Sequence, residues 1–313
     1  MPDTPVITVQ QTQVYAGHRG AVFAMATAPD ARWLYTAGDD GIVAGWDLHA
    51  SHDLGTALLQ AGCAVYSLVS VPGHNWLAAG LSDGTLQLVD LTSRQLVATW
   101  RRADQAVYGL HYDAATDLLW ILYARGGLSV YSLARQQEIA YLQVCQDHLR
   151  ALCAPPGVPY WYIGASDGYI YTLDPLQMTV RSRHAAHTSS VFSLMWMPDP
   201  ARLLSGGRDA QIQVWDPTGP DTPLETIPAH LYTVNAMALH PVSPVWASAS
   251  RDKTLKLWHT RSMALLKVID APRHNGHKHS VNKIAWLAQD FSLISCSDDR
   301  KVIRWSVNLD EIS

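Results

Sequence analysis

The sequence predicts an all-β protein built from seven copies of one unit of about 42 residues. The first observation behind this prediction is a recurring motif, with Ser or Thr four residues before an Asp and Trp six residues after it. The second is that short apolar runs rich in β-branched and aromatic residues fill each copy, separated by turn pairs such as Asp40-Gly41 and Asp83-Gly84. The third is that no segment shows a sustained helical period. Each copy is therefore expected to form four short strands.

The motif places the seven copies in one register. Four copies are complete and also carry a His 22 residues before the Asp: these sets are His18, Thr36, Asp40 and Trp46, then His187, Ser205, Asp209 and Trp215, then His230, Ser248, Asp252 and Trp258, then His277, Ser295, Asp299 and Trp305. Copies 2 and 4 keep the Asp as Asp83 and Asp167, and copy 3 has Arg125 in its place. The residue four positions after the His register is Val or Leu in every copy.

The register also sets the boundaries of the repeats within a single domain over residues 1–313. We expect the repeats at roughly 15–57, 58–99, 100–141, 142–183, 184–226, 227–269 and 270–313. Residues 6–14 alternate between apolar and polar side chains and predict one additional strand before the first repeat.

The motif resembles the WD40 repeat family. The resemblance is carried by Gly17-His18 with Asp40 and Trp46-Asp47, by Ala186-His187 with Asp209 and Trp215-Asp216, and by Gly276-His277 with Asp299 and Trp305. It covers the chain from about residue 15 to residue 306. It implies a seven-bladed β-propeller with one four-stranded antiparallel blade per repeat around a central channel. It also implies that the strand at 6–14 joins the last blade and closes the ring, which would hide the sheet edges.

The same resemblance implies that the His, the Ser or Thr, the Asp and the Trp of a complete repeat form a buried structural tetrad. A hydrolase triad is the alternative interpretation of these residue types, but the set recurs four times and a catalytic site does not need to recur. Such a polar chain satisfies groups that would otherwise be costly to bury. Repeats 2, 3 and 4 lack the His and the Trp, so we expect their blades to have lower local stability.

Composition and charge exclude several other classes. Lys plus Arg is 23 and Asp plus Glu is 27, and the net charge of −4 argues against binding to nucleic acid or to an anionic membrane. Four scattered cysteines predict neither a disulfide framework nor a zinc site. The first residues lack the features of a secretory signal and no apolar run is long enough to span a bilayer, so we expect a soluble, cytoplasmic protein.

Metal and cofactor binding are not expected either. His274, His277 and His279 are close in sequence, but His277 already belongs to the repeat motif and the others lie in a polar insertion. No phosphate-binding loop or dinucleotide fingerprint precedes a helix. We therefore predict no catalytic residue, no metal and no cofactor.

The surface that remains is the mouth of the implied channel. In WD40 propellers the partner usually sits over the channel on the face of the His loops, and the resemblance implies contacts at the residue five after the His register and at the residue before the Asp. The first position reads Phe23, Tyr66, Tyr108, Arg150, Phe192, Asn235 and Asn282. The second position has four charged residues, Asp39, Arg208, Arg251 and Asp298.

A single aromatic residue at the first position is explained equally well by strand packing. Four aromatics and an arginine in register favour a binding surface, because such residues dominate interaction hot spots. We expect an aromatic arc over repeats 1 to 3 to face an arginine-bearing arc over repeats 4 to 6. The expected partner is a protein or peptide, such as an acidic segment with an apolar anchor.

These observations predict a non-enzymatic interaction scaffold that is monomeric by itself. One alternative is a structural subunit of a larger complex that uses several faces, which exposed Trp76, Trp100 or Trp161 would favour. The other is a propeller enzyme with its active site in the channel. The first of the two contact positions, however, supplies neither Glu nor Asp to the channel.

Overall fold

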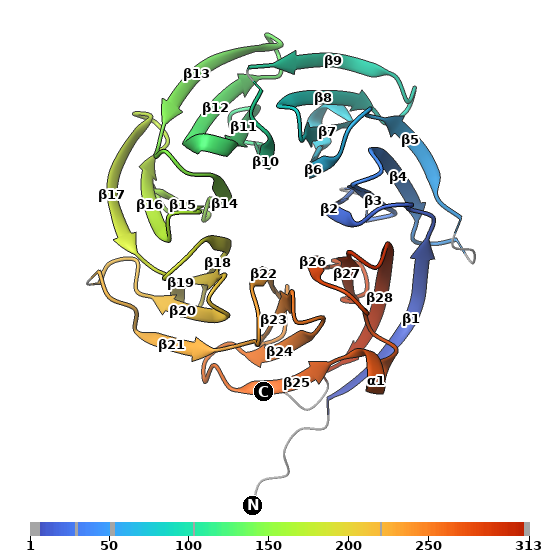
Figure 1. The fold of residues 1–313 in the computed structure, drawn as a ribbon, viewed down its shortest axis with the longest axis vertical. Helices are drawn as coiled ribbons and strands as arrows, with labels where there is room; N and C mark the ends of the chain where they lie inside the picture. Colours follow the sequence, from blue (N-terminus) through green and yellow to red (C-terminus); the bar gives the residue numbers. More distant parts are fainter. Residues whose placement is uncertain (1–6, 29–30, 51–53, 103, 220, 310–313) are drawn as a thin grey trace, which may run out of the picture.

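Seven four-stranded antiparallel sheets stand around a central channel and form a closed ring (Figure 1). The computed structural model describes residues 7–28, 31–50, 54–102, 104–219 and 221–309. This architecture confirms the predicted all-β, seven-bladed propeller. We number the blades 1 to 7 after the repeats that supply their first strands.

Each blade begins with the strand nearest the channel (Figure 1). These innermost strands are β2 (Val22–Thr27), β6 (Val65–Val71), β10 (Val107–Asp113), β14 (Leu149–Cys153), β18 (Val191–Pro198), β22 (Val234–Leu239) and β26 (Val281–Trp286). The second strands are β3 (Trp33–Gly38), β7 (Trp76–Leu81), β11 (Leu118–Tyr123), β15 (Trp161–Ala165), β19 (Ala201–Gly207), β23 (Val245–Ser250) and β27 (Leu293–Ser297).

The chain continues outward through the third and fourth strands of each blade. The third strands are β4 (Ile42–Asp47), β8 (Thr85–Asp90), β12 (Gly127–Ser132), β16 (Tyr169–Asp174), β20 (Gln211–Trp215), β24 (Leu255–His259) and β28 (Lys301–Asn308). The outer strands are β5 (Thr56–Gln60), β9 (Leu96–Arg101), β13 (Gln137–Gln143), β17 (Thr179–Ala185), β21 (Glu225–Pro228), β25 (Leu265–Ile269) and β1 (Thr8–Ala16).

The outer strand of blade 7 comes from the other end of the chain. Strand β1 pairs antiparallel with β28, from Thr8 opposite Asn308 to Ala16 opposite Lys301. The prediction that an N-terminal strand closes the ring is therefore confirmed, although the strand runs to Ala16 rather than stopping at residue 14, and Val6 lies outside the described residues. This pairing covers the edge that β28 would otherwise expose.

The core is divided among the contacts between neighbouring blades. Seven apolar clusters are present, and each one combines residues of two adjacent blades. The Val or Leu four residues after the His register is fully buried in all seven blades: Val22, Val65, Val107, Leu149, Val191, Val234 and Val281. Burial of apolar surface between blades therefore holds the ring together, including where blade 7 meets blade 1.

The turn that joins the second and third strands has one backbone feature in common in all seven blades, although in blade 3 it is a 3-10 turn in which Arg125 also has a positive φ. Its residue after the Asp position has a positive φ throughout, such as 93° at Gly84 and 75° at Lys253. Glycine occupies this position in blades 1 to 4, where it adopts the conformation at no steric cost. In every blade the N–H of the residue before the Asp position donates to a carbonyl three residues after the His register. The seven turns therefore lie beside the His loops on one face of the ring, which we call the His-loop face.

Helical structure is minor. Within the described ranges it consists of one four-residue helix, α1 (Ala271–His274), and two 3-10 turns, η1 (Pro72–His74) and η2 (Ala124–Gly126). The Asp270 side chain caps α1 by accepting the Arg273 N–H. None of these described helices is long and apolar enough to cross a membrane.

Candidate functional site

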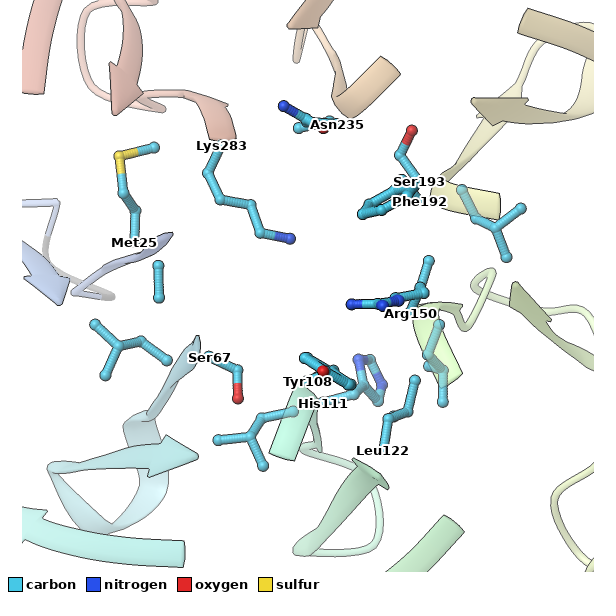
Figure 2. Close-up of a pocket in the computed structure, with 18 of the residues that line it drawn as sticks. Met25, Ser67, Tyr108, His111, Leu122, Arg150, Phe192, Ser193, Asn235 and Lys283 are labelled. Carbon is cyan, nitrogen blue, oxygen red and sulfur yellow. The ribbon is translucent and has the colours of Figure 1, made fainter. Parts of the chain in front are cut away.

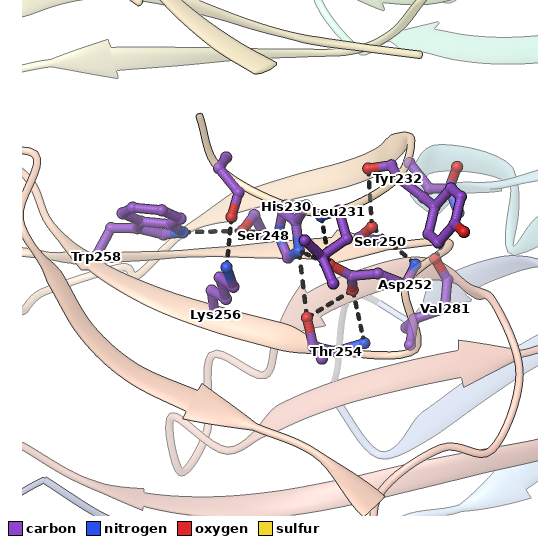
Figure 3. Close-up of polar contacts among 12 residues, drawn as sticks. His230, Leu231, Tyr232, Ser248, Ser250, Asp252, Thr254, Lys256, Trp258 and Val281 are labelled. Carbon is purple, nitrogen blue, oxygen red and sulfur yellow. Dashed lines mark hydrogen bonds and ion pairs between the residues drawn. The ribbon is translucent and has the colours of Figure 1, made fainter. Parts of the chain in front are cut away.

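The four residues of a complete repeat form one hydrogen-bonded chain, seen for blade 6 in Figure 3. Trp258 Nε1–H donates to Ser248 Oγ at 2.8 Å, and Ser248 Oγ lies 2.8 Å from His230 Nε2. His230 Nδ1 lies 2.9 Å from the Asp252 carboxylate. Because Asp252 also accepts the N–H groups of Leu231 and Thr254, the carboxylate ties the His loop to the turn between β23 and β24.

Blades 1, 5 and 7 repeat this arrangement with nearly the same geometry. The distance from His Nε2 to the hydroxyl is 2.8 Å in blades 1 and 7 and 2.9 Å in blade 5. The distance from Trp Nε1 to the hydroxyl is 2.8, 3.0 and 2.9 Å in blades 1, 5 and 7. The structure therefore brings together all sixteen residues that the sequence groups into tetrads.

Burial sets the charges within the tetrad. Desolvation lowers the pKa of His230, which favours the neutral imidazole. Burial alone would raise the pKa of Asp252, but hydrogen bonds from His230, Thr254 and the Leu231 N–H outweigh it and hold that pKa far below its usual value. A neutral His with its proton on Nδ1 can then accept from the Ser248 hydroxyl and donate to the carboxylate.

The tetrad hydroxyls are poor candidates for a nucleophile. Thr36, Ser205, Ser248 and Ser295 are fully buried. Each of them also accepts a Trp N–H, so no substrate reaches the oxygen. The chemistry that this arrangement performs is structural satisfaction of buried polar groups.

Blades 3 and 4 use other contacts where the tetrad is incomplete. In blade 4 the Tyr171 hydroxyl donates to Asp167 at 2.5 Å. In blade 3 the Arg102 guanidinium stacks on Tyr141, 3.6 Å from the ring centroid, and pairs with Glu138. Apart from the motif residue Asp167, these contacts use residues outside the repeat motif, so the sequence pattern did not indicate them.

The mouth of the channel carries one continuous row of stacked side chains. Phe23 contacts Tyr66 with ring centroids 5.6 Å apart, and Tyr66 stacks on Tyr108 at 5.5 Å. The Arg150 guanidinium then lies 4.2 Å from the Tyr108 ring centroid and 5.2 Å from that of Phe192. All five side chains are half-exposed, and Figure 2 shows Tyr108, Arg150 and Phe192 together at the channel.

This row differs from the two opposed arcs that the sequence predicts. Arg150 is sandwiched between aromatic rings and continues the row, because residues in the same register of adjacent blades are close enough to stack. Its Nε–H also donates to Ser166 Oγ at 2.9 Å. The prediction of a separate arginine-bearing arc over repeats 4 to 6 therefore applies only to Arg208 and Arg251, which are exposed on blades 5 and 6.

Of the remaining predicted contact residues, two are exposed aspartates and two are asparagines that form hydrogen bonds with other residues. Asp39 and Asp298 are exposed on the neighbouring blades 1 and 7. Asn235 donates to the Val281 carbonyl at 2.8 Å, and Asn282 donates to the Val22 carbonyl at 2.9 Å and to Asp298 at 2.7 Å. The two asparagines thus fasten blade 6 to blade 7 and blade 7 to blade 1.

The structure adds an apolar feature that the sequence interpretation missed. Leu231 and Tyr232 directly follow His230 and are 83% and 61% exposed. Their loop lies against the turn that holds Arg251, because the Arg251 N–H donates to the Thr233 carbonyl at 3.0 Å. A signal was present in the sequence, since the other complete repeats have polar residues or Gly at these two positions.

Two observations concern the residues named for the alternative interpretations. Trp76, Trp100 and Trp161 are only partly exposed, and each packs on another ring, at 4.5 to 5.7 Å between centroids. The described residues contain no group of three or more His, Cys, Asp or Glu side chains that could hold a metal ion. His277 is committed to its tetrad, as the sequence predicts.

Comparison with known proteins identifies the family. The family model described as "WD domain, G-beta repeat" matches residues 9–47, 56–90, 178–216, 221–259 and 271–306, which together make up more than half of the chain. The chain belongs to the WD40 family. The unmatched stretch at 91–177 holds most of blades 3 and 4, where this WD40 chain lacks complete tetrads but keeps the blade architecture.

Curated relatives of this WD40 chain are longer proteins. Human striatin is 24% identical over 280 residues, covering 80% of this chain and 35% of striatin. "Target of rapamycin complex 1 subunit mip1" of Schizosaccharomyces pombe is 23% identical over 303 residues, covering 89% of this chain and 23% of that protein. "Small ribosomal subunit protein RACK1z" of Oryza sativa subsp. japonica is 30% identical over 125 residues, covering 38% of this chain and 36% of that protein. The chain spans about a third of the striatin length.

Proposed function

We propose that this WD40 chain is a non-enzymatic scaffold that binds an extended protein segment over the channel mouth on the His-loop face. The observation that carries the proposal is the half-exposed row from Phe23 through Arg150 to Phe192. Stacked aromatic and arginine side chains are already ordered before binding, so little side-chain entropy is lost when a partner covers them.

The charge and shape of the neighbouring blades indicate the character of the segment. Arg251 is exposed on the turn that contacts the loop of Leu231 and Tyr232, and Arg208 is exposed on the neighbouring blade 5. Arginine binds carboxylates with two parallel hydrogen bonds, and the exposed Leu and Tyr side chains offer apolar area. An acidic segment with an apolar residue fits this part of the face.

The relatives support the general role. By their names, mip1 is a subunit of target of rapamycin complex 1 and RACK1z is a protein of the small ribosomal subunit. A third relative is named "Anaphase-promoting complex subunit cdc20" of Dictyostelium discoideum. Membership of an assembly is the role we propose for this chain as well.

The test uses a protein that co-purifies with the chain and is then expressed on its own for affinity measurements. Tyr66→Ala and Arg251→Ala are each expected to weaken its binding about 30-fold, which corresponds to about 2 kcal/mol for a hot-spot residue. The matched control is Arg261→Ala, since Arg261 is an exposed arginine of the same blade that follows β24 rather than lying on the His-loop face. Affinity is also expected to fall as salt rises, because the arginine contacts are exposed.

The opposite pattern of results would contradict the proposal. If Tyr66→Ala and Arg251→Ala retain the partner while Trp76→Ala or Trp161→Ala releases it, the partner binds another face. The melting temperature of each variant shows whether a loss of binding comes from the surface or from unfolding.

A further inference from the structure

A polar cavity lies in the channel beneath the stacked row. Its volume is about 260 Å³, and its walls come from the innermost strands of all seven blades and from Leu122 of β11. Figure 2 shows that two cationic side chains, Lys283 and Arg150, extend into it from different walls. The lining includes no Asp or Glu side chain.

Lys283 stands out against the repeat pattern. It lies six residues after the His register, where the other six repeats have Ala, Ser or Gly: Ala24, Ser67, Gly109, Ala151, Ser193 and Ala236. In every innermost strand this position follows a β-bulge, here between Val281 and Lys283. Only in blade 7 does the position carry a long charged side chain, and this side chain reaches into the channel.

The Lys283 ammonium group has no hydrogen bond or ion pair with any residue that the structure describes. Its side chain is exposed to the channel, but protein surrounds the channel, and this dehydration lowers the pKa of Lys283. The nearby buried Cys296 offers no charge compensation, because burial raises the pKa of its thiol to about 12. A partly dehydrated cation without a counter-charge is costly, and an anion in the cavity would relieve that cost.

Arg150 supplies a second positive charge from blade 4, which is as far around a ring of seven as a blade can be from blade 7. Its guanidinium is held in place by Tyr108, Phe192 and Ser166 but has no carboxylate partner among the described residues. Other polar groups of the wall are already engaged, since the Ser67 hydroxyl donates to Val107 and Asn235 donates to Val281. Lys283 and Arg150 are therefore the two cationic groups that the wall offers to a ligand, beside the Tyr108 hydroxyl and the His111 imidazole.

We propose that the channel is an anion-binding site, in which a phosphate or carboxylate group is held by Lys283 with Arg150 on the facing wall. Positive charge in a confined, partly dehydrated space attracts an anion more strongly than it would on the surface. The group can belong to a free small molecule or to a side chain that enters from the channel mouth. The site does not depend on the proposed protein partner, because a free anion is sufficient.

The experiment observes the NMR signal of the Lys283 side chain. The chain has six lysines, all between residues 253 and 301, so reductive methylation with ¹³C-formaldehyde gives few signals. Inorganic phosphate and pyrophosphate are titrated at constant ionic strength, and the Lys283 signal is assigned from its loss in Lys283→Met. We expect a saturable shift of this signal and a rise in the apparent pKa of Lys283 when the anion binds. The titratable groups that neighbour Lys283 in the channel wall are Arg150, Tyr108, His111 and Cys296.

Variants connect the signal to affinity. Lys283→Met is expected to weaken pyrophosphate binding at least tenfold in calorimetry, and Lys283→Arg is expected to retain it because the charge is kept. The matched control Lys301→Met removes an exposed lysine on β28, away from the cavity lining, and is expected to bind like the wild type.

The outcomes separate the two sources of the anion. A saturable response to phosphate or pyrophosphate supports a free small anion. If these give no response but a hexaglutamate peptide shifts the Lys283 signal, the anion is a side chain of a bound segment. The proposal is overturned if none of the three probes shifts the Lys283 signal, or if Lys283→Met binds as tightly as Lys301→Met. Failure here leaves the surface test with Tyr66→Ala and Arg251→Ala unaffected, because those residues do not line the cavity.

Discussion

Replacing Asp252 with alanine tests whether a complete tetrad stabilises the propeller. Asp252→Ala removes the carboxylate that accepts from the fully buried His230 imidazole, from the Thr254 hydroxyl and from the Leu231 and Thr254 N–H groups. The Thr254 hydroxyl lies 3.2 Å from His230 Nδ1 and can replace the carboxylate as acceptor, but its own O–H then loses its acceptor. A buried donor without an acceptor costs about 1–3 kcal/mol, and the two backbone N–H groups add less because water can reach the loop. We expect a loss of about 3 kcal/mol in the free energy of unfolding.

The matched control is Asp83→Ala, at the same position of blade 2. Asp83 accepts the Thr85 N–H at 3.0 Å, but Ala61 stands where the His would be and 40% of the Asp83 side chain is exposed. The replacement there is expected to cost about 1 kcal/mol or less, because no imidazole depends on this carboxylate and water can reach the position that the half-exposed Asp83 side chain leaves.

Differential scanning calorimetry distinguishes the two variants. For 313 residues the unfolding entropy corresponds to about 1.5 °C in the melting temperature for each kcal/mol. Asp252→Ala should therefore melt about 4–5 °C below the wild type, and Asp83→Ala within about 1.5 °C of it. Equal shifts for the two variants would show that the buried His link contributes nothing beyond an ordinary turn.

Three further predictions concern the ring as a whole. Amide hydrogens of blades 2 to 4 are expected to exchange faster than those of blades 5 to 7, because complete tetrads are confined to blades 1 and 5 to 7, and uniform protection would contradict this. Deleting residues 1–16 removes β1 and should cause aggregation through the exposed edge of β28, whereas a soluble monomer with unchanged melting would argue against the closure. Burial lowers the pKa of His111, His230 and His240 below the usual value of about 6.5, so the unfolded chain takes up protons first as the pH falls. The melting temperature should then be level above pH 7 and fall below about pH 6.5, and a melting temperature that is constant from pH 7.5 to 5.5 would refute this reasoning.

The fold was predictable from sequence because the tetrad needs particular residue types at fixed spacing. His230, Ser248, Asp252 and Trp258 can meet only if the loop and two strands between them have set lengths. The weaker blades stayed recognisable through the buried Val or Leu of their first strands, such as Val107 and its equivalents in the other blades. Packing between blades requires that residue whether or not the tetrad is present.

The candidate site was only partly predictable, because it depends on contacts between blades. The register placed Tyr108 and Arg150 at equivalent positions, but their stacking comes from the distance between adjacent blades, which a repeat pattern does not contain. Lys283 was missed for a different reason. Side chains of a regular strand alternate between its two faces, and the bulge after Val281 interrupts that alternation.

The antiparallel closure of the ring sets how the protein responds to mechanical force. Thr8 pairs with Asn308 and Ala16 with Lys301, so residues 7 and 309 leave the same end of the β1–β28 ladder. A pull between these two residues therefore loads the paired residues one after another, in an unzipping geometry, and does not shear all of them at once. The ring is expected to open under a low force applied at its ends, although its blades are held to one another by buried surface on every side.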